Sequence, residues 1–195
     1  MAYITDSWAE IDRNCKLGKA QELYSLGDLK TITFTIGYVE ETIDMEIVGF
    51  NHDDIPYQGK ASITFISKQL LTEYRQMYSS RNNTGGWAGS YCRLRRWCNE
   101  DLFNALPSDL RSVIRSVYKL SDGGNGSTTL VQTVDTIWLP SWSEVVHTPN
   151  NLVTLDGQGT RYEQTQYPVG LASSADWRVK KKSDGTAYHW WLRSA

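Results

Sequence analysis

The strongest constraint in the sequence is a two-residue alternation of apolar and polar side chains between Thr31 and Gly49. The apolar positions flank a turn at Gly37-Tyr38 and are Ile32, Phe34 and Ile36 before it, and Ile43, Met45 and Ile47 after it. This period is that of a half-buried strand, and glycine favours the turn. The pattern predicts an antiparallel β-hairpin with one face in a core, which a chain of 195 residues is long enough to bury.

Short helices are predicted around this hairpin. Ser7-Trp8-Ala9-Glu10 has the form of a capping box, and Gly18 is a suitable stop for the helix that follows. Ser141 to Glu144 has a second capping box. Other helices are expected from Ser67 to Met77, from a cap at Ser90 to Leu102, and from a cap at Ser108 to Val117, with strands at Ala61 to Ile66 and Thr133 to Leu139.

Polar connections occupy much of the rest of the chain. Asn82 to Gly86 and Gly123 to Ser127 have the composition of loops, and Thr148 to Gly185 is rich in Asn, Gly, Ser, Thr and Gln. These patterns predict an α+β fold in which short helices pack on small antiparallel sheets with long loops. We expect one domain over residues 1–195, with residues 1–26 as a helical segment packed on it or on a neighbouring subunit.

Charge and hydropathy argue against two classes of partner. The net charge is −2 and the isoelectric point is near 5.9, so no global attraction to nucleic acid is expected. The basic run Lys180-Lys181-Lys182 is interpreted as a solvated edge. Membrane insertion is not expected, because no stretch approaches 18 apolar residues, and the N-terminus has no features of a signal peptide, which predicts synthesis in the cytoplasm.

The sequence offers no recognisable catalytic or metal-binding motif. His52 with Asp53 and Asp54 is interpreted as a polar turn, with part of a cation site as the alternative. Cys92 and Cys98 have neither zinc-site nor disulfide spacing, and no nucleotide-binding loop is present. Glu40-Glu41 is interpreted as an ordinary pair of surface charges. We therefore predict no catalytic residue, no metal and no cofactor.

An ordered set of short motifs runs through the second half of the chain. It comprises Gly85-Gly86-Trp87 with Ser90 and Arg93, Ala105-Leu106-Pro107 with Asp109-Leu110, Asp135 to Leu139 with Ser143-Glu144-Val145, and Tyr188-His189-Trp190-Trp191-Leu192-Arg193-Ser194. With Gly49 to Asp54 and Ala61 to Phe65, this set resembles the DUF6273 family, which is common in phages, prophages and bacterial surface proteins and carries a terminal Trp-Trp-Leu-Arg-Ser-Pro motif. The resemblance covers roughly Gly27 to Ser194 and implies a C-type-lectin-like fold.

The chain departs from this family at its end. Ala195 stands where the family usually has proline, and relatives usually continue to a further closing strand. Either this is a naturally short member, or another chain supplies the strand. Since an unpaired strand edge can be covered by a neighbour, a homo-oligomer or a larger assembly is expected.

The resemblance and the residue chemistry together assign candidate sites. Trp87, Arg93, Trp190, Trp191 and Arg193 are expected to be structural, with Arg193 bonding carbonyls or pairing with a carboxylate. The polar and aromatic residues that flank the terminal motif are expected to contact a ligand, and they are Asp184, Thr186, Tyr188 and His189.

Three functions follow from the resemblance. The leading one is a non-catalytic virion protein, on a tail, baseplate or head surface, that binds a host receptor, a glycan or a neighbouring virion protein. The alternative is a purely architectural decoration or connector subunit. An enzyme on the scaffold of formylglycine-generating enzymes ranks third, because that chemistry requires a reactive cysteine pair that Cys92 and Cys98, on a predicted helix, do not supply.

Overall fold

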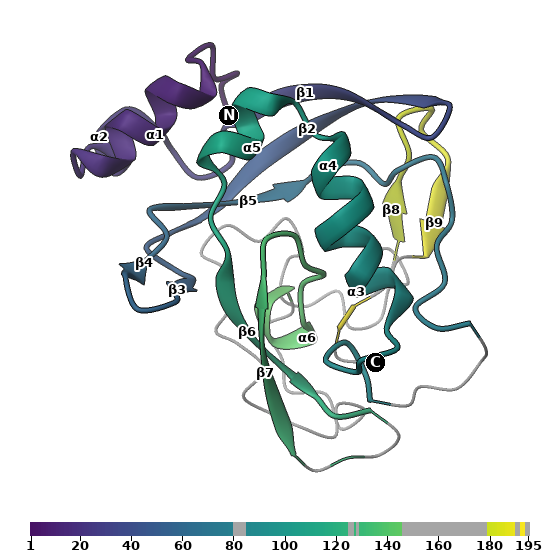
Figure 1. Cartoon of the computed structure of the whole chain (residues 1–195). Helices are drawn as coiled ribbons and strands as arrows, with labels where there is room; N and C mark the ends of the chain where they lie inside the picture. Colours follow the sequence, from purple (N-terminus) through teal and green to yellow (C-terminus); the bar gives the residue numbers. More distant parts are fainter. Residues whose placement is uncertain (80–84, 125–126, 128, 146–178, 190–191, 194–195) are drawn as a thin grey trace, which may run out of the picture.

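The computed structural model describes residues 1–79, 85–124, 127, 129–145, 179–189 and 192–193. Its centre is a three-stranded antiparallel sheet with strand order β1-β2-β5 (Figure 1). β1 (Leu29–Ile36) and β2 (Val39–Phe50) form the predicted hairpin, in which Ile32 pairs with Ile43 and the turn lies at Gly37, whose φ is 61°. β5 (Ile63–Ser67) pairs with the other edge of β2, which confirms the strand predicted there.

Helices cover the apolar face of this sheet. α1 (Trp8–Lys16) and α2 (Ala20–Leu23) precede β1, and the Trp8 ring meets the Phe65 ring edge to face at 5.5 Å. Figure 1 shows α4 next to the sheet and α3 extending away from it. The core joins side chains from the sheet and from these helices: Trp8, Ile11, Ala20, Tyr24, Ile32, Phe34, Ile36, Ile43, Ile47, Phe50, Leu102, Leu106 and Leu110.

The central helix has three consecutive parts. They are α3 (Arg93–Trp97), a π-helical turn η1 (Cys98–Leu102) and α4 (Phe103–Ala105). The predicted cap at Ser90 is wrong, because Cys92 occupies the N-cap position and no side chain caps the helix. The wide turn begins beside Asn99, whose amide nitrogen donates to the Arg95 carbonyl at 3.0 Å. A side chain inserted into the backbone ladder is a common cause of such a local change in helical winding.

The helix predicted from Ser67 to Met77 is wrong. The chain from residue 68 to residue 79 is irregular, because distant acceptors take up the backbone donors that a helix would need. Lys68 N donates to the Asp44 carbonyl and Leu70 N to the Lys181 carbonyl. Thr72 N donates to Glu41 Oε1 at 2.7 Å, so Glu41 is a buried anchor rather than the surface charge that was expected.

The next helix is shorter than predicted. α5 (Ser108–Val113) has Pro107 at its N-cap, so Ser108 lies inside the helix and does not cap it. Val117, which was expected at the end of this helix, begins β6 (Val117–Asp122) instead. β6 pairs with β7 (Leu130–Asp135), which starts and ends earlier than the strand predicted at Thr133 to Leu139. It ends at Asp135 because the next two backbone donors, Thr136 N and Ile137 N, bond Asn99 Oδ1.

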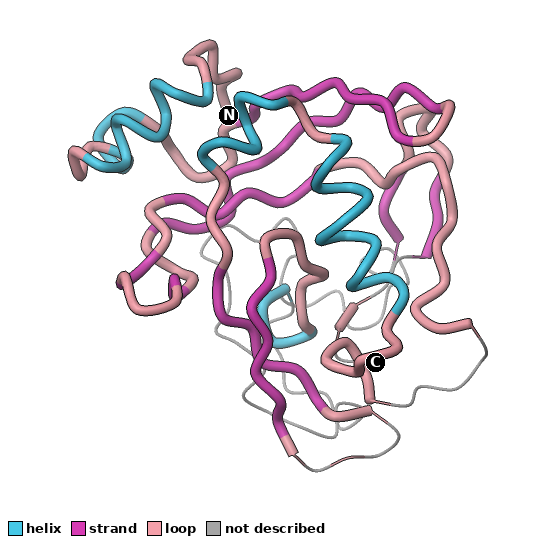
Figure 2. Tube along the Cα trace, in the orientation of Figure 1, coloured by secondary structure: helices cyan, strands magenta, loops and turns pink. Residues whose placement is uncertain are grey.

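Small two-stranded units complete the described chain (Figure 2). β3 (Asp54–Ile55) pairs with β4 (Gly59–Lys60), and β8 (Val179–Lys181) pairs with β9 (Ala187–His189). α6 (Trp142–Val145) begins with the predicted capping box, in which Ser141 N donates to Glu144 Oε2 at 2.9 Å and Glu144 N to Ser141 Oγ at 3.3 Å. The protein thus has a mixed α/β fold of small antiparallel sheets and short helices. Most of the predicted loop from Thr148 to Gly185 lies outside the described residues.

No helix within the described ranges is both long enough and apolar enough to cross a bilayer.

We expect Ser7→Ala to lower the free energy of unfolding by about 1 kcal/mol. Ser7 Oγ accepts from Glu10 N, and Ser7 N donates to Glu10 Oε2 at 2.8 Å, so the substitution removes one half of a closed capping box. Urea unfolding measures the change. Ser108→Ala is the matched control, because this exposed serine caps nothing. Equal stability of the two variants would contradict a role for the cap.

Candidate functional site

The β8–β9 hairpin carries three of the four predicted ligand-contacting residues. Asp184 and Thr186 are exposed and form its turn, because Thr186 N donates to Asp184 Oδ1 at 2.8 Å. This hydrogen bond holds the pKa of the Asp184 carboxyl below its usual value. Tyr188 follows on β9. The side chain of His189, and Trp190 and Trp191 altogether, lie outside the described residues.

Tyr188 belongs to an exposed cluster that we call the tyrosine–lysine cluster, formed by Tyr74, Lys182 and Tyr188. The two tyrosine rings meet edge to face at 5.1 Å, and their exposed fractions are 66% for Tyr74 and 37% for Tyr188. Lys182 Nζ lies 4.8 Å from each ring centroid and donates to the Thr72 carbonyl at 2.7 Å. The ammonium group therefore holds both rings in place through cation–π contacts.

The lysine run beside this cluster differs from its predicted character at one position. Lys180 is buried between β8 and the sheet, and its ammonium donates to the Ser67 carbonyl. Burial lowers the pKa of Lys180 to about 8, although the nearby Glu46 charge acts in the opposite direction. The interpretation of the whole run as a solvated edge is therefore wrong for Lys180. It holds for Lys181, which is exposed.

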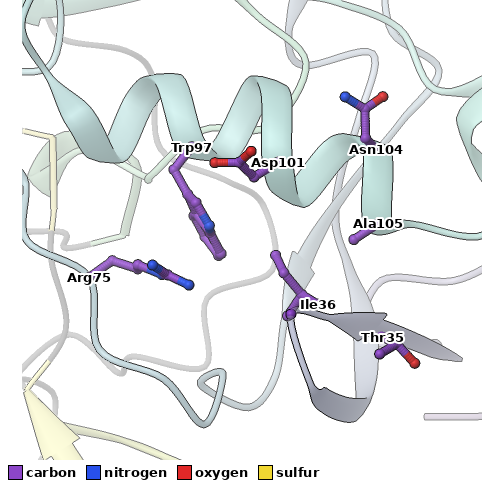
Figure 3. Close-up of a pocket in the computed structure, with 8 residues that line it drawn as sticks. Thr35, Ile36, Arg75, Trp97, Asp101, Asn104 and Ala105 are labelled. Carbon is purple, nitrogen blue, oxygen red and sulfur yellow. The ribbon is translucent and has the colours of Figure 1, made fainter.

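An open pocket of about 360 Å³ lies between the β1–β2 turn and the central helix (Figure 3). Its polar wall includes Asp101 and Asn104 from the helix and Arg75 from the irregular segment. The Arg75 guanidinium lies 5.0 Å from the Trp97 ring centroid, and the indole forms an aromatic wall of the pocket. Arg75 also pairs with Glu73 at 2.5 Å. The pocket therefore combines an aromatic surface with donors and acceptors.

Four buried charged side chains are connected to one another, and we call them the buried ion chain: Arg193, Glu144, Lys119 and Asp53. Arg193 is fully buried and donates to both Glu144 oxygens, at 2.5 and 2.7 Å. It also donates to the Leu120 carbonyl at 3.0 Å and the Leu139 carbonyl at 2.8 Å. Arg193 therefore both bonds carbonyls and pairs with a carboxylate.

Lys119 continues the buried ion chain. Its ammonium lies 2.9 Å from Glu144 Oε1 and also pairs with Asp53 Oδ1. The second Asp53 oxygen accepts from Thr64 Oγ1 at 2.6 Å, and His52 Nδ1 lies 3.2 Å from Asp53 Oδ1. The interpretation of His52 to Asp54 as a simple polar turn is therefore wrong for Asp53, whose carboxylate is a buried ion-pair partner. Two carboxylates and two cations bring the chain close to neutrality.

The neighbouring charges control the protonation of this chain. Burial raises the pKa of Asp53, but the His52 hydrogen bond and the Lys119 charge outweigh it, so the pKa lies well below its usual value. Burial likewise opposes ionisation of Glu144, but Arg193 and Lys119 lower its pKa on balance. The pKa of His52 is raised on balance. Burial lowers it, but the hydrogen bond to Asp53 and the charge of Asp53 outweigh this effect. The carboxyl groups of Asp53 and Glu144 are therefore held in their ionised forms.

A further buried carboxylate, Asp135 at the end of β7, connects Trp87 to the central helix. Trp87 is fully buried, and its indole N–H donates to Asp135 Oδ2 at 3.0 Å, while Arg95 Nε donates to Asp135 Oδ1 at 2.6 Å. Gly86 is required before Trp87, because its φ is 54° and a Cβ there would lie 2.7 Å from the Asp122 carbonyl. Arg93, which was expected beside Trp87 as a structural residue, is exposed at the start of α3.

Burial makes the cysteine thiols less reactive, because it raises the pKa of each of them. All three cysteines are free, and burial raises the pKa of Cys98 to about 12, so its thiol stays protonated. Across the described part of the chain, no group of three His, Cys, Asp or Glu side chains is arranged to hold a metal ion. The functional residues that the sequence analysis missed are Asp53, Lys119 and Asp135. Each is an ordinary residue in its local context, and its lysine–carboxylate or arginine–carboxylate ion pairs form only with partners 25 or more positions away.

We expect Glu144→Gln to lower the free energy of unfolding by about 3 to 5 kcal/mol, because it leaves the Arg193 and Lys119 charges buried with one carboxylate fewer. Chemical denaturation measures the loss. Glu40→Gln, at an exposed position of β2, should change stability by no more than about 0.5 kcal/mol. A loss of similar size in both variants would show that the buried ion chain is not special.

The same network gives stability a defined pH dependence. Asp53 and Glu144 have lowered pKa values in the folded protein. Their contribution to the free energy of unfolding is therefore complete above their unfolded pKa values of about 4, and it is lost as pH falls through the folded values. His52 has a raised pKa, so its contribution is complete below about 6.5 and is lost as pH rises through the folded value. Urea midpoints of the native protein and His52→Gln should differ most at pH 5 to 6 and converge at alkaline pH. A difference that grows with pH would contradict this assignment.

Comparison with known proteins places the chain in one family. No curated protein and no solved structure matches it. A family model described as "Domain of unknown function (DUF6273)" matches residues 61–195, about two thirds of the chain. The matched range includes the tyrosine–lysine cluster and three of the four members of the buried ion chain. The chain therefore belongs to the DUF6273 family.

Proposed function

We propose that this chain is a non-catalytic, virion-associated binding protein of a phage or prophage that recognises a host-surface glycan through the tyrosine–lysine cluster. The proposal includes a C-type-lectin-like arrangement of the fold. Family membership supports this arrangement, since the resemblance implies it, and small antiparallel sheets joined by long connections are compatible with it.

The observation that carries the proposal is the pair of exposed rings at Tyr74 and Tyr188. Exposed aromatic rings contribute nothing to the packing of the core. Here, however, a cation and an edge-to-face contact hold the two rings in one geometry. A partner that binds such rings loses little side-chain entropy on association. The cluster is thus preorganised for recognition.

A glycan fits the chemistry of this surface. A tyrosine ring offers an apolar face for the C–H groups of a sugar, while its hydroxyl remains available for hydrogen bonds. The Lys182 ammonium adds a donor that suits sugar hydroxyls or carboxylates. Asp184 and Thr186 supply further polar groups in the adjacent turn. Aromatic rings with a few fixed polar groups around them are typical of recognition surfaces.

A binding role rather than catalysis is favoured by the state of the ionisable groups. In the described ranges, Asp53, Lys119 and Glu144 are buried and committed to one another, and the Cys98 thiol is protonated. General acid–base or nucleophilic chemistry requires such groups to reach a substrate. The exposed groups of the tyrosine–lysine cluster instead suit contact without proton transfer.

The test is binding of the purified full chain to an array of bacterial surface polysaccharides, with an array of envelope proteins alongside. We expect retention on at least one polysaccharide, and Tyr188→Ala and Tyr74→Ala should each weaken it by about tenfold or more. Tyr91→Ala is the matched control, because Tyr91 is even more exposed than the two cluster tyrosines but lies outside the cluster. Retention on proteins alone, or equal binding by the cluster and control variants, would overturn the proposal.

A further inference from the structure

The open pocket between the β1–β2 turn and the central helix, which we call the Trp97 pocket, has the size of a small-molecule site. Its volume of about 360 Å³ lies within the range of roughly 300 to 1,000 Å³ that is typical of ligand pockets. The tyrosine–lysine cluster and the buried ion chain share no residue with its lining. The pocket is therefore a separate candidate for ligand binding.

One end of the Trp97 pocket is formed by an indole that its neighbours hold in place. Figure 3 shows the Trp97 ring projecting from the helix between Arg75 and Ile36. The Arg75 guanidinium lies 5.0 Å from the ring centroid and pairs with Glu73 at 2.5 Å, so it is fixed from two sides. Because the guanidinium covers one face of the indole, a ligand meets the opposite face or the ring edge. The negative π face of an indole attracts C–H groups.

The rest of the lining offers hydrogen-bonding groups of both kinds. Asp101 and Asn104 are exposed on the helix, and Thr35 is exposed on β1. Within the described ranges of the chain, these three side chains have no hydrogen-bond or ion-pair partner. A carboxylate, an amide and a hydroxyl together accept from and donate to the hydroxyl groups of a ligand.

A π-helical turn lies in the wall of the Trp97 pocket. η1 spans Cys98–Leu102 and therefore includes Asp101, and Trp97 and Asn104 flank it on the same helix. Turns of this kind are rare inside helices and occur frequently at functional sites. The helix thus departs from regular winding at the point where it meets the pocket.

The charges around the pocket favour an uncharged ligand. Among its described lining residues, Arg75 is the cation and Asp101 the anion, and Arg75 is paired with Glu73. A phosphate or carboxylate would lose its hydration and meet a cation that already has a partner. An apolar ligand would cover Asp101 and Asn104 without bonding them. A neutral saccharide meets both requirements, since it has hydroxyl groups for the polar wall and C–H groups for the indole.

The Trp97 pocket adjoins the tyrosine–lysine cluster. Tyr74 belongs to the cluster, and Arg75, the next residue, belongs to the pocket. The Cα atoms of consecutive residues are about 3.8 Å apart. A chain of sugars that contacts the two tyrosine rings can therefore continue into the pocket.

We propose that the Trp97 pocket is a second saccharide-binding site, which takes an uncharged disaccharide segment of the glycan that the tyrosine–lysine cluster binds. Trp97 packs against one sugar ring, and Asp101 accepts hydrogen bonds from its hydroxyl groups. Thr35 and Asn104, at the end of the pocket away from Arg75, contact the next sugar unit (Figure 3). This inference rests on the proposed function for the identity of the glycan, but the affinity of the pocket for a disaccharide is measured on its own.

Two neighbouring carboxylates provide a variant and its matched control. Asp101→Ala removes the acceptor from the pocket wall, at an exposed helical position where alanine is favourable. Glu100→Ala removes an exposed carboxylate from the same helix that does not line the pocket. Both variants should therefore fold, and only the first should affect the pocket.

The first measurement is fluorine NMR of the full chain labelled with fluorotryptophan and titrated with cellobiose, maltose, lactose and chitobiose. The spectrum of Trp97→Phe identifies the Trp97 resonance. We expect at least one disaccharide to shift this resonance. Asp101→Ala should weaken that binding by about tenfold or more, because hydrogen bonds to a charged group are lost, and Glu100→Ala should leave it unchanged. No shift at tens of millimolar disaccharide, or equal affinity of Asp101→Ala and the native protein, would overturn the proposal.

The polysaccharide array separates a failure of this proposal from a failure of the proposed function. Asp101→Ala and Tyr188→Ala should both weaken retention on the same polysaccharide. A loss in Tyr188→Ala alone would retain the cluster as the glycan site and overturn the role of the pocket. A loss in Asp101→Ala alone would support the pocket and overturn the role of the cluster, and a loss in neither would overturn both. If no polysaccharide is retained, the proposed function fails, and the disaccharide titration alone decides on the pocket.

Discussion

The buried ion chain from Arg193 through Glu144 and Lys119 to Asp53 is the interaction on which the rest of the structure depends. Desolvating four charges is costly, and the cost is offset only because each charge meets an opposite one with good hydrogen-bond geometry. The chain joins segments that share no sheet: the turn after β2, strand β6, helix α6 and the C-terminal motif. In a fold of small hairpins, it replaces the hydrogen-bonded ladder that one large sheet would provide.

The ion pairs of the interior leave their charged groups unavailable for contact at the surface. With the four charges of the buried ion chain paired, the surface features described above that suit contact with a partner contain aromatic rings: the tyrosine–lysine cluster and the Trp97 pocket. Each is held by irregular chain or a tight turn that the interior fixes in position. A loop-rich protein can present such rings accurately only if its core is specified by directional interactions.

Local patterns predicted the parts of the fold that local interactions determine. The capping boxes at Ser7 and Ser141 and the hairpin around Gly37 need only neighbours within a few residues, and the structure confirms them. The helix expected from Ser67 failed because its backbone donors bond Glu41 and Lys181, which no local pattern reveals. Long-range acceptors overrode a helical propensity worth only fractions of a kcal/mol per residue.

The candidate site was predictable to the same extent. Tyr188 could be singled out by its place beside the terminal motif, but its partner Tyr74 is more than 110 positions away and carries no signal of its own. Lys180 and Glu41 looked like surface charges, since burial of a charged residue depends on tertiary partners.

A double-mutant cycle between the two ends of the buried ion chain tests this account most directly. Asp53 and Arg193 do not touch, yet Lys119 and Glu144 connect them, so their contributions to stability should be linked. Asp53→Asn and Arg193→Gln, made singly and together, should show a coupling free energy of at least about 1 kcal/mol in chemical unfolding. Additive effects, within about 0.5 kcal/mol, would mean that the four charges act as separate pairs and do not hold the fold together as one unit.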